Sequence, residues 1–420
     1  EPTATPEVVE AFRRLEQAIW REEQQAPAPA PALSFANARL QALNAEQMKA
    51  EERATNWSKA GGGAGTDEGM RQVILELGIH RNEERAAEHE EFIANINRQI
   101  LAKYEVVLLD RRREEAEEEV KMLTAKVNYL QGLYQEEDHL LGDLFGEAYG
   151  NDEEKKIELE LDKLRSYRDT LSGGELQWRE AAMLVQNSTE LLERAVTCWK
   201  QINSGTPESR FHLSTEARNC IQEASLNVQS AQALLSGVQF PYCTTREINA
   251  VLQALVYIFT DIQITDRYTH AGQCYSNFHQ RAQALCKWIQ EITNKSLKKD
   301  LADVDKKVSE TTERLRKLRV SLIRHKMGDY SMEGMSAGII READGLRRLT
   351  TAERRFNPQQ PLRPAFDPHK IPMQQDFNIQ GGNFWPNQEF SDMNLNQGRQ
   401  WNSNQWGNGA GTQIPGQWGQ

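Results

Sequence analysis

Residues 116–141 read AEEEVKMLTAKVNYLQGLYQEEDHLL, and the spacing of their apolar side chains decides the fold class of the chain. The spacing alternates between four and three residues with one polar break, and the positions are Ala116, Val120, Leu123, Val127, Leu130, Tyr134, Glu137 and Leu141. These side chains share one face of a helix, as the a and d positions of a coiled coil do. The charged run REEAEEE (113–119) is interpreted as the solvated face of that helix.

A second seam with the same spacing lies in residues 301–322; its positions are Leu301, Val304, Val308, Thr311, Leu315, Leu318 and Leu322. Two arrangements would bury these stripes. The seams could pair with each other in an antiparallel hairpin, or each could pair with a second copy of the chain. The spacing does not choose between them. Pairing between copies would make the protein a homo-oligomer, which is our prediction.

Proline is almost absent from the middle of the chain, where only Pro207 and Pro241 occur between Ala32 and Asn357. A proline inside a helix removes a backbone donor and costs about 3 kcal/mol. A long proline-poor span with repeating apolar faces therefore predicts helix after helix, packed as a bundle. We predict an all-α fold: an elongated helical bundle with coiled-coil segments, flanked by a tethered N-terminal helix and a disordered C-terminal tail.

Helix start signals and shifts in composition divide the chain into segments. Asn151, Thr206 with Pro207, and Thr244 with Glu247 have the residue types that begin helices. The stretches APAPAPA (26–32) and GGGAG (61–65) predict stiff and flexible linkers. The predicted segments are a short amphipathic helix (1–25), a Pro/Ala- and Gly-containing linker (26–69), a long helix with a coiled-coil seam (70–149), a helical bundle with buried Cys and Trp (151–290), a coiled-coil continuation (291–327), a basic connector (328–355) and a disordered tail (356–420).

Residues 171–175 read LSGGE, which resembles the signature loop of ABC-type and SMC-type ATPases. That loop acts on nucleotide held by a Walker A loop, whose lysine follows a glycine. The chain contains no Gly-Lys pair. We interpret LSGGE as a turn between two helices, with Ser172 as the N-cap and Glu175 as its capping-box partner.

Composition restricts the remaining classes of function. The net charge of −11 opposes binding to the nucleic-acid backbone, and no apolar run is long enough to span a membrane. Five widely spaced cysteines without a CxxC motif favour a reducing, cytoplasmic location. His270 and Cys274 lie one helical turn apart, but core packing is the favoured interpretation over a zinc site. We predict no enzyme activity and no cofactor.

The C-terminal residues 356–420 are rich in Asn, Gln, Gly and Pro, and aromatic residues are spaced through them. This composition predicts disorder. The aromatic residues are candidate contacts for protein partners, and those we select are Phe384, Trp385, Trp401, Trp406 and Trp418. In the basic segment before them, Arg347-Arg348-Leu349-Thr350 resembles a kinase substrate, so Thr350 is a candidate phosphoacceptor.

These features predict a non-catalytic scaffold or adaptor that self-associates and recruits protein partners, with the aromatic tail as one recruiting element. The alternative is an RNA- or RNP-associated factor, in which the basic segment and the aromatic tail contact single strands by stacking. An equally plain interpretation of the tail is a solvated extension without specific contacts.

Overall fold

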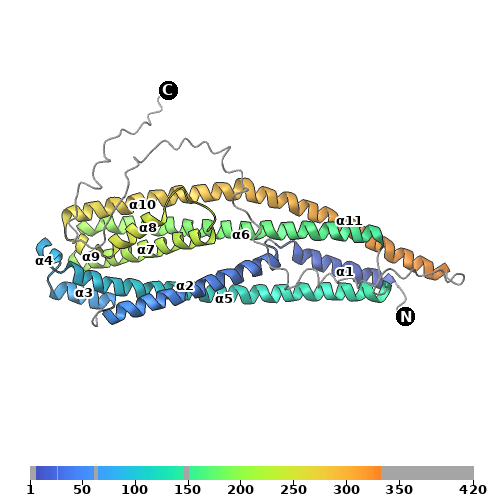
Figure 1. Cartoon of the computed structure of the whole chain (residues 1–420), viewed down its shortest axis with the longest axis horizontal. Coiled ribbons are helices and arrows are strands. Elements are labelled where there is room, and N and C mark those ends of the chain that lie inside the picture. Colours follow the sequence, from blue (N-terminus) through green and yellow to red (C-terminus); the bar gives the residue numbers. More distant parts are fainter. Residues whose placement is uncertain (1–5, 26, 61–64, 146–150, 333–420) are drawn as a thin grey trace, which may run out of the picture. The chain divides into compact units, whose positions relative to one another are not determined.

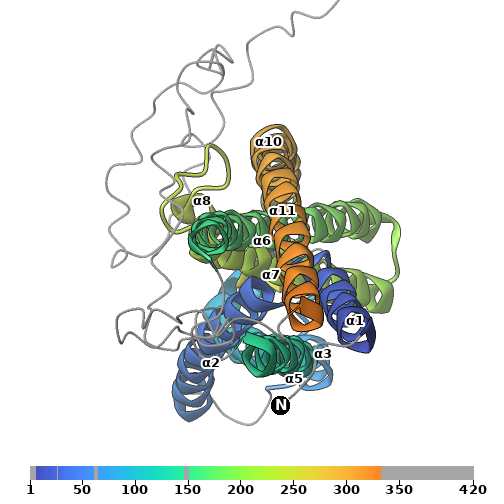
Figure 2. The same cartoon turned by 90° about the vertical axis from the view of Figure 1, so that its right-hand side faces the viewer.

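The computed structural model describes residues 6–25, 27–60, 65–145 and 151–332, and these residues form helices and no strand. Long helices pack side by side as a bundle (Figures 1 and 2). Helix α6 (Asp152–Gln201) contacts α2 (Pro29–Ala60), α7 (Pro207–Leu234), α10 (Thr265–Ile292) and α11 (Lys298–Met332). Helix α5 (Glu90–Phe145) packs against α2 and α1 (Pro6–Glu23). The predicted all-α bundle is therefore confirmed for this part of the chain.

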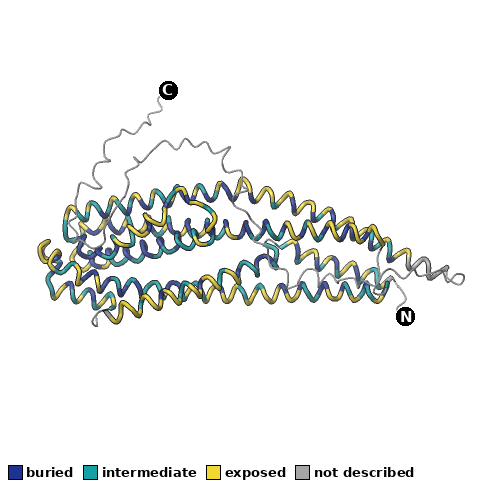
Figure 3. Tube along the Cα trace, viewed as in Figure 1, coloured by how far each residue is buried: buried dark blue, intermediate teal, exposed yellow. Residues whose placement is uncertain are grey.

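Shorter elements complete the described residues. They are α3 (Asp67–Glu76), α4 (Glu83–Glu88), α8 (Thr245–Leu255), α9 (Ile258–Asp261), a 3-10 turn (Ile202–Ser204) and a π-helical turn (Thr293–Leu297) that joins α10 to α11. Burial alternates along the long helices, as expected of amphipathic helices (Figure 3). No helix in the described ranges has an apolar stretch long enough to cross a lipid bilayer.

Most positions of both predicted seams are buried against other helices of the same chain; the half-buried positions are Val120, Leu123, Leu301, Leu318 and Leu322. In α5, Leu130 and Tyr134 pack on Ile19 of α1, and Ala116 packs with Leu43 of α2. The second seam packs on α6 in one apolar cluster, formed by Val304, Val308, Leu315, Ile157, Leu161 and Leu171. The first seam thus packs on α1 and α2, and the second on α6. Neither pairing of the seams with each other nor a second copy is needed to bury these stripes.

The predicted helix starts are confirmed by their capping hydrogen bonds. The Asn151 side chain accepts from the backbone N–H of Glu154 at 2.8 Å, and Thr206 caps α7 with Pro207 in the first turn. Thr244 and Glu247 form a complete capping box at the start of α8. These signals are local, because each cap satisfies backbone donors of its own first turn.

The predicted turn at residues 171–175 is wrong, because LSGGE lies inside the continuous helix α6. Each interior glycine costs a helix about 1 kcal/mol relative to alanine. Tertiary packing offsets this cost. Leu171 is buried against α11, and buried Trp178 has its ring centroid 5.9 Å from that of Trp288 in α10. Burial of each large side chain contributes about 1.5–3 kcal/mol, which is enough to stabilise α6 despite its two glycines.

The linker predicted for residues 26–69 is mostly helical in the structure, because α2 occupies Pro29–Ala60. Its prolines at positions 29 and 31 lie in the first turn, where backbone N–H groups have no intrahelical acceptor. Proline therefore begins this helix without breaking it. Most of the predicted flexible stretch GGGAG lies outside the described residues, which resume at Gly65.

Residues 70–149, predicted as one long helix, contain a break before α5. Helix α3 ends at Glu76, with Leu77 as its C-cap; Gly78 follows with a φ of +66°, and the backbone N–H of Ile79 donates to the carbonyl of Ile74 at 3.1 Å. This is the glycine-terminated helix end that a left-handed residue makes possible. Asn82 then caps α4 by accepting from the N–H of Arg85.

Candidate functional site

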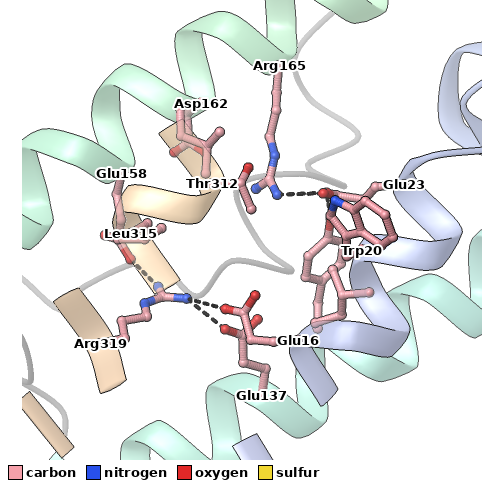
Figure 4. A pocket seen from close by; sticks show the side chains of 13 residues that line it. Glu16, Trp20, Glu23, Glu137, Glu158, Asp162, Arg165, Thr312, Leu315 and Arg319 are labelled. Atoms are coloured by element: carbon pink, nitrogen blue, oxygen red, sulfur yellow. Dashed lines mark hydrogen bonds and ion pairs between the residues drawn. The ribbon is translucent and has the colours of Figure 1, made fainter. Parts of the chain in front are cut away.

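Four helices meet at one buried arginine, Arg319 of α11 (Figure 4). Its Nη2 donates to Oε1 of Glu158 at 2.6 Å, and its Nε donates to Oε1 of Glu154 at 3.0 Å; both glutamates belong to α6. Its Nη1 donates to Oε1 of Glu137 in α5 at 2.7 Å and lies 3.8 Å from Oε1 of Glu16 in α1. All five residues are at most 7% exposed. We call these five residues the Arg319 cluster.

The helix stripes explain how these charges become buried. Glu137 is the polar break in the seam of α5, between Tyr134 and Leu141, so the face that packs on α1 carries it inward. Glu154 and Glu158 are one turn apart beside the buried Ile157 of α6. The same periodicity that places apolar residues in the core therefore places these carboxylates there.

A second buried ion pair lies next to the Arg319 cluster. Arg165 of α6 is 2.8 Å from the carboxylate of Glu23 in α1, and the Tyr134 hydroxyl donates to the same carboxylate. Between the two groups is a small cavity of about 30 Å³, which Glu16, Glu23, Glu137, Glu158, Arg165 and Arg319 help to line. Figure 4 shows these side chains converging from the four helices. Helix α1 thus contributes a carboxylate to each of two buried cations.

The electrostatics of the cluster are unbalanced, with one guanidinium facing four carboxyl groups. Burial raises the pKa of Glu137 well above its ordinary value, and the neighbouring Glu16 raises it further. Burial alone would lower the pKa of Arg319, but the carboxylates around it, Glu137 first, raise that pKa well above its usual range. Arg319 therefore stays charged while Glu137 favours a bound proton. The site can hold four helices together and can bind or release a proton.

A separate buried arginine, Arg218, forms hydrogen bonds near the N-terminal end of α5. Arg218 of α7 is 1% exposed, and it donates to Asn97 Oδ1 at 3.1 Å and to Asp67 Oδ1 at 2.8 Å. Asn97 in turn donates to the carbonyls of Leu255 and Val256. These bonds tie α3, α5, α7 and the end of α8 together. Burial lowers the pKa of Arg218. We assign a structural role to this network, because its polar atoms are engaged with one another.

A larger groove of about 930 Å³ lies among α2, α5, α6 and α7. It is lined by as many arginines as glutamates, namely Arg39, Arg111, Arg112, Arg179, Arg194, Glu115, Glu119, Glu180, Glu190 and Glu223. Several of these charges pair across it; Arg39, for example, is 3.1 Å from Glu119 and 3.2 Å from Glu180. The balanced lining favours neither an anion nor a cation.

The cysteines and histidines do not assemble into a metal centre within the described residues. Cys274 Sγ lies 3.6 Å from His270 Nε2, as their spacing predicts, and no group of three or more His, Cys, Asp or Glu suited to a metal occurs in the part of the chain described. Burial raises the pKa of the Cys274 thiol to about 11 and that of Cys243 to about 12. These thiols are therefore protonated at neutral pH.

The site residues selected from sequence all lie outside the described residues. They are Phe384, Trp385, Trp401, Trp406, Trp418 and Thr350, so their roles stay predictions. Sequence reasoning missed Arg319, Glu16, Glu154 and Glu158. Only Glu137 carried a signal, as the charged residue within an apolar seam, and its partners are ordinary members of a highly charged chain.

The Arg319 cluster joins four helices through buried charges, and we take it as the candidate functional site. Comparison with protein-family models, with curated proteins and with solved structures finds no match to this chain.

Proposed function

We propose that this chain is a non-catalytic helical scaffold or adaptor that self-associates and recruits protein partners. The supporting observation is an outward face on α5 with two large side chains, Met122 and Tyr129, which are 63% and 56% exposed. They are seven residues apart, and therefore lie on nearly the same side of the helix.

Small residues share this face with them. Ala125 is exposed, and at Gly132 a Cβ atom would meet nothing within 4 Å apart from the adjacent residues and the backbone of its own helix. Helical spacing puts both within about 80° of Met122. We call Met122, Ala125, Tyr129 and Gly132 the outward face of α5. It adjoins the side of α5 that packs on α1, because Leu133 of that side lies one turn from Tyr129.

This combination suits the approach of another helix. Methionine and tyrosine are enriched at protein interfaces, and small residues between them leave room for the side chains of a partner. Exposed glutamates and lysines flank the face and would form a polar rim. Because the two seams are already buried within the chain, self-association is assigned to the outward face of α5.

The self-association is tested by sedimentation velocity on the full-length protein over a hundredfold range of concentration. We expect the mass of the unmodified protein to rise with concentration, and a Met122→Glu/Tyr129→Glu double variant to stay monomeric. The matched control is Thr124→Glu/Asn128→Glu, which adds the same charge at exposed positions of α5 on another side of the helix. Monomeric mass of the unmodified protein at every concentration would refute self-association.

Partner recruitment is tested by affinity purification and mass spectrometry with the same variants and with a chain that ends after Arg355. Loss of partners in the Met122→Glu/Tyr129→Glu variant, with retention in the control, would support the outward face of α5. Loss only on truncation would assign recruitment to the tail and contradict the assignment to α5. Binding of RNA at low salt that weakens steeply with salt would favour the alternative function instead.

A further inference from the structure

Helix α1 docks on the rest of the bundle as a separate amphipathic helix. A short segment connects it to α2, and its contacts are with α5 and α11 and, through Glu23, with α6. Its inward residues are Phe12, Glu16, Ile19 and Glu23, spaced by four, three and four residues. The docked face thus alternates apolar side chains with carboxylates.

The surface that receives α1 matches this alternation. Leu141, Leu144 and Ile323 surround Phe12, and Leu130, Leu133 and Tyr134 surround Ile19; these residues come from α5 and α11. Arg319 and Arg316 face Glu16, at 3.8 and 3.5 Å, and Arg165 faces Glu23. The surface therefore selects a helix that has apolar residues and carboxylates at heptad spacing.

Negative charge is in excess where α1 docks. The charged and titratable groups that face the Arg319 cluster or line its cavity are Glu16 and Glu23 of α1, Tyr134, Glu137 and Asp138 of α5, Glu154, Glu158, Asp162 and Arg165 of α6, and Arg316 and Arg319 of α11. Docked α1 covers Glu137 and brings the carboxyl group of Glu16 beside it. Both effects disfavour a charged Glu137.

We propose that α5, α6 and α11 form a helix-binding surface that α1 fills reversibly, and that docking of α1 is coupled to the uptake of a proton at Glu137. The partner that fits this surface is an amphipathic helix with the pattern of α1, and α1 is the occupant within the chain. This inference concerns the docking of α1 and does not depend on partner binding by the outward face of α5.

The sign of the coupling follows from the raised pKa of Glu137 in the docked state. Docking is favoured at low pH and weakens as the pH rises from the ordinary glutamate pKa of about 4.3 towards the raised value. One proton changes the docking equilibrium by at most about tenfold per pH unit. Release of α1 at higher pH would open the surface to another helix of the same pattern.

Hydrogen exchange of the full-length protein, followed by mass spectrometry between pH 5 and pH 8, tests the proposal. Protection factors, in which the intrinsic pH dependence of exchange is divided out, are compared for α1 and for α6. We expect protection of α1 to fall as the pH rises over this range, by at most about tenfold per pH unit, while that of α6 stays constant.

Paired variants separate the proton coupling from general destabilisation. Glu137→Gln keeps an uncharged hydrogen-bonding group in place and is expected to leave α1 protection constant within about twofold across the range. Glu136→Gln removes an exposed carboxylate one residue away and is expected to behave like the unmodified chain. On α1, Glu16→Gln should reduce the pH dependence, and Glu10→Gln, at an exposed position, should not. The proposal is overturned if α1 protection is independent of pH, if it falls equally in Glu137→Gln, or if α1 and α6 change in parallel.

Discussion

Replacement of Arg319 by methionine removes the only cation at the centre of the Arg319 cluster. The guanidinium makes three hydrogen bonds of 2.6, 2.7 and 3.0 Å to carboxylates that are nearly inaccessible to water. Loss of one partner of a buried ion pair costs about 3–5 kcal/mol, because charge is left without compensation. We therefore expect Arg319→Met to lower the free energy of unfolding by about 3–5 kcal/mol at pH 7.

Protonation limits this penalty and makes it depend on pH. To protonate a glutamate whose ordinary pKa is about 4.3 costs about 1.4 kcal/mol per pH unit, hence about 3.7 kcal/mol at pH 7 and about 1 kcal/mol at pH 5. A carboxylate that loses Arg319 can accept a proton at that cost. A penalty of about 3–5 kcal/mol at pH 7 corresponds to about one stranded carboxylate, so the destabilisation caused by Arg319→Met should shrink by about 2–3 kcal/mol between pH 7 and pH 5.

Urea denaturation followed by far-ultraviolet circular dichroism at both pH values measures this difference. Arg316→Met is the matched control, because Arg316 lies on the same helix and contacts Glu16 and Glu313, but is 30% exposed at its side chain. Partly exposed ion pairs contribute about 0–1 kcal/mol, so the control should change stability by less than about 1 kcal/mol. If Arg319→Met destabilises no more than the control at pH 7, or destabilises equally at both pH values, the assigned electrostatics are wrong.

Two further predictions test the helix through LSGGE and the state of the buried thiols. Gly173→Ala should stabilise the protein by about 0.5–1 kcal/mol, because Gly173 lies inside α6 and its new methyl group would meet nothing within 4 Å apart from the adjacent residues and the backbone of its own helix. Gly78→Ala, at a φ of +66°, should destabilise the protein by about 1–2 kcal/mol. Thermal or urea unfolding compares the stabilities of the two variants. Destabilisation by Gly173→Ala would contradict the helix at LSGGE and support the turn that the sequence predicts. Since burial raises the pKa of Cys243 to about 12, about one thiol in ten thousand is ionised there at pH 8. Mass spectrometry after alkylation at pH 8 should find Cys243 unmodified in the folded protein and fully modified in urea; rapid modification without urea would contradict its burial.

Helix starts and buried helix faces could be predicted from the sequence, because residues within one or two turns of helix determine them. Asn151, Thr206 and Thr244 begin helices because their own side chains satisfy nearby backbone donors. The apolar stripes of residues 116–141 and 301–322 likewise identified the buried faces of α5 and α11, because the period of a helix sets which side chains share a side.

The tertiary structure decided what these faces contact and where packing overrides local preference. LSGGE is helical because Leu171 and Trp178 are anchored by α11 and α10, which the five residues themselves do not reveal. The buried site is also a tertiary product. Glu137 and its partner Arg319 are 182 residues apart, and each resembles many other charged residues of the chain. Only the convergence of four helices removes water from both, and that desolvation buries these charges and raises the pKa of Glu137.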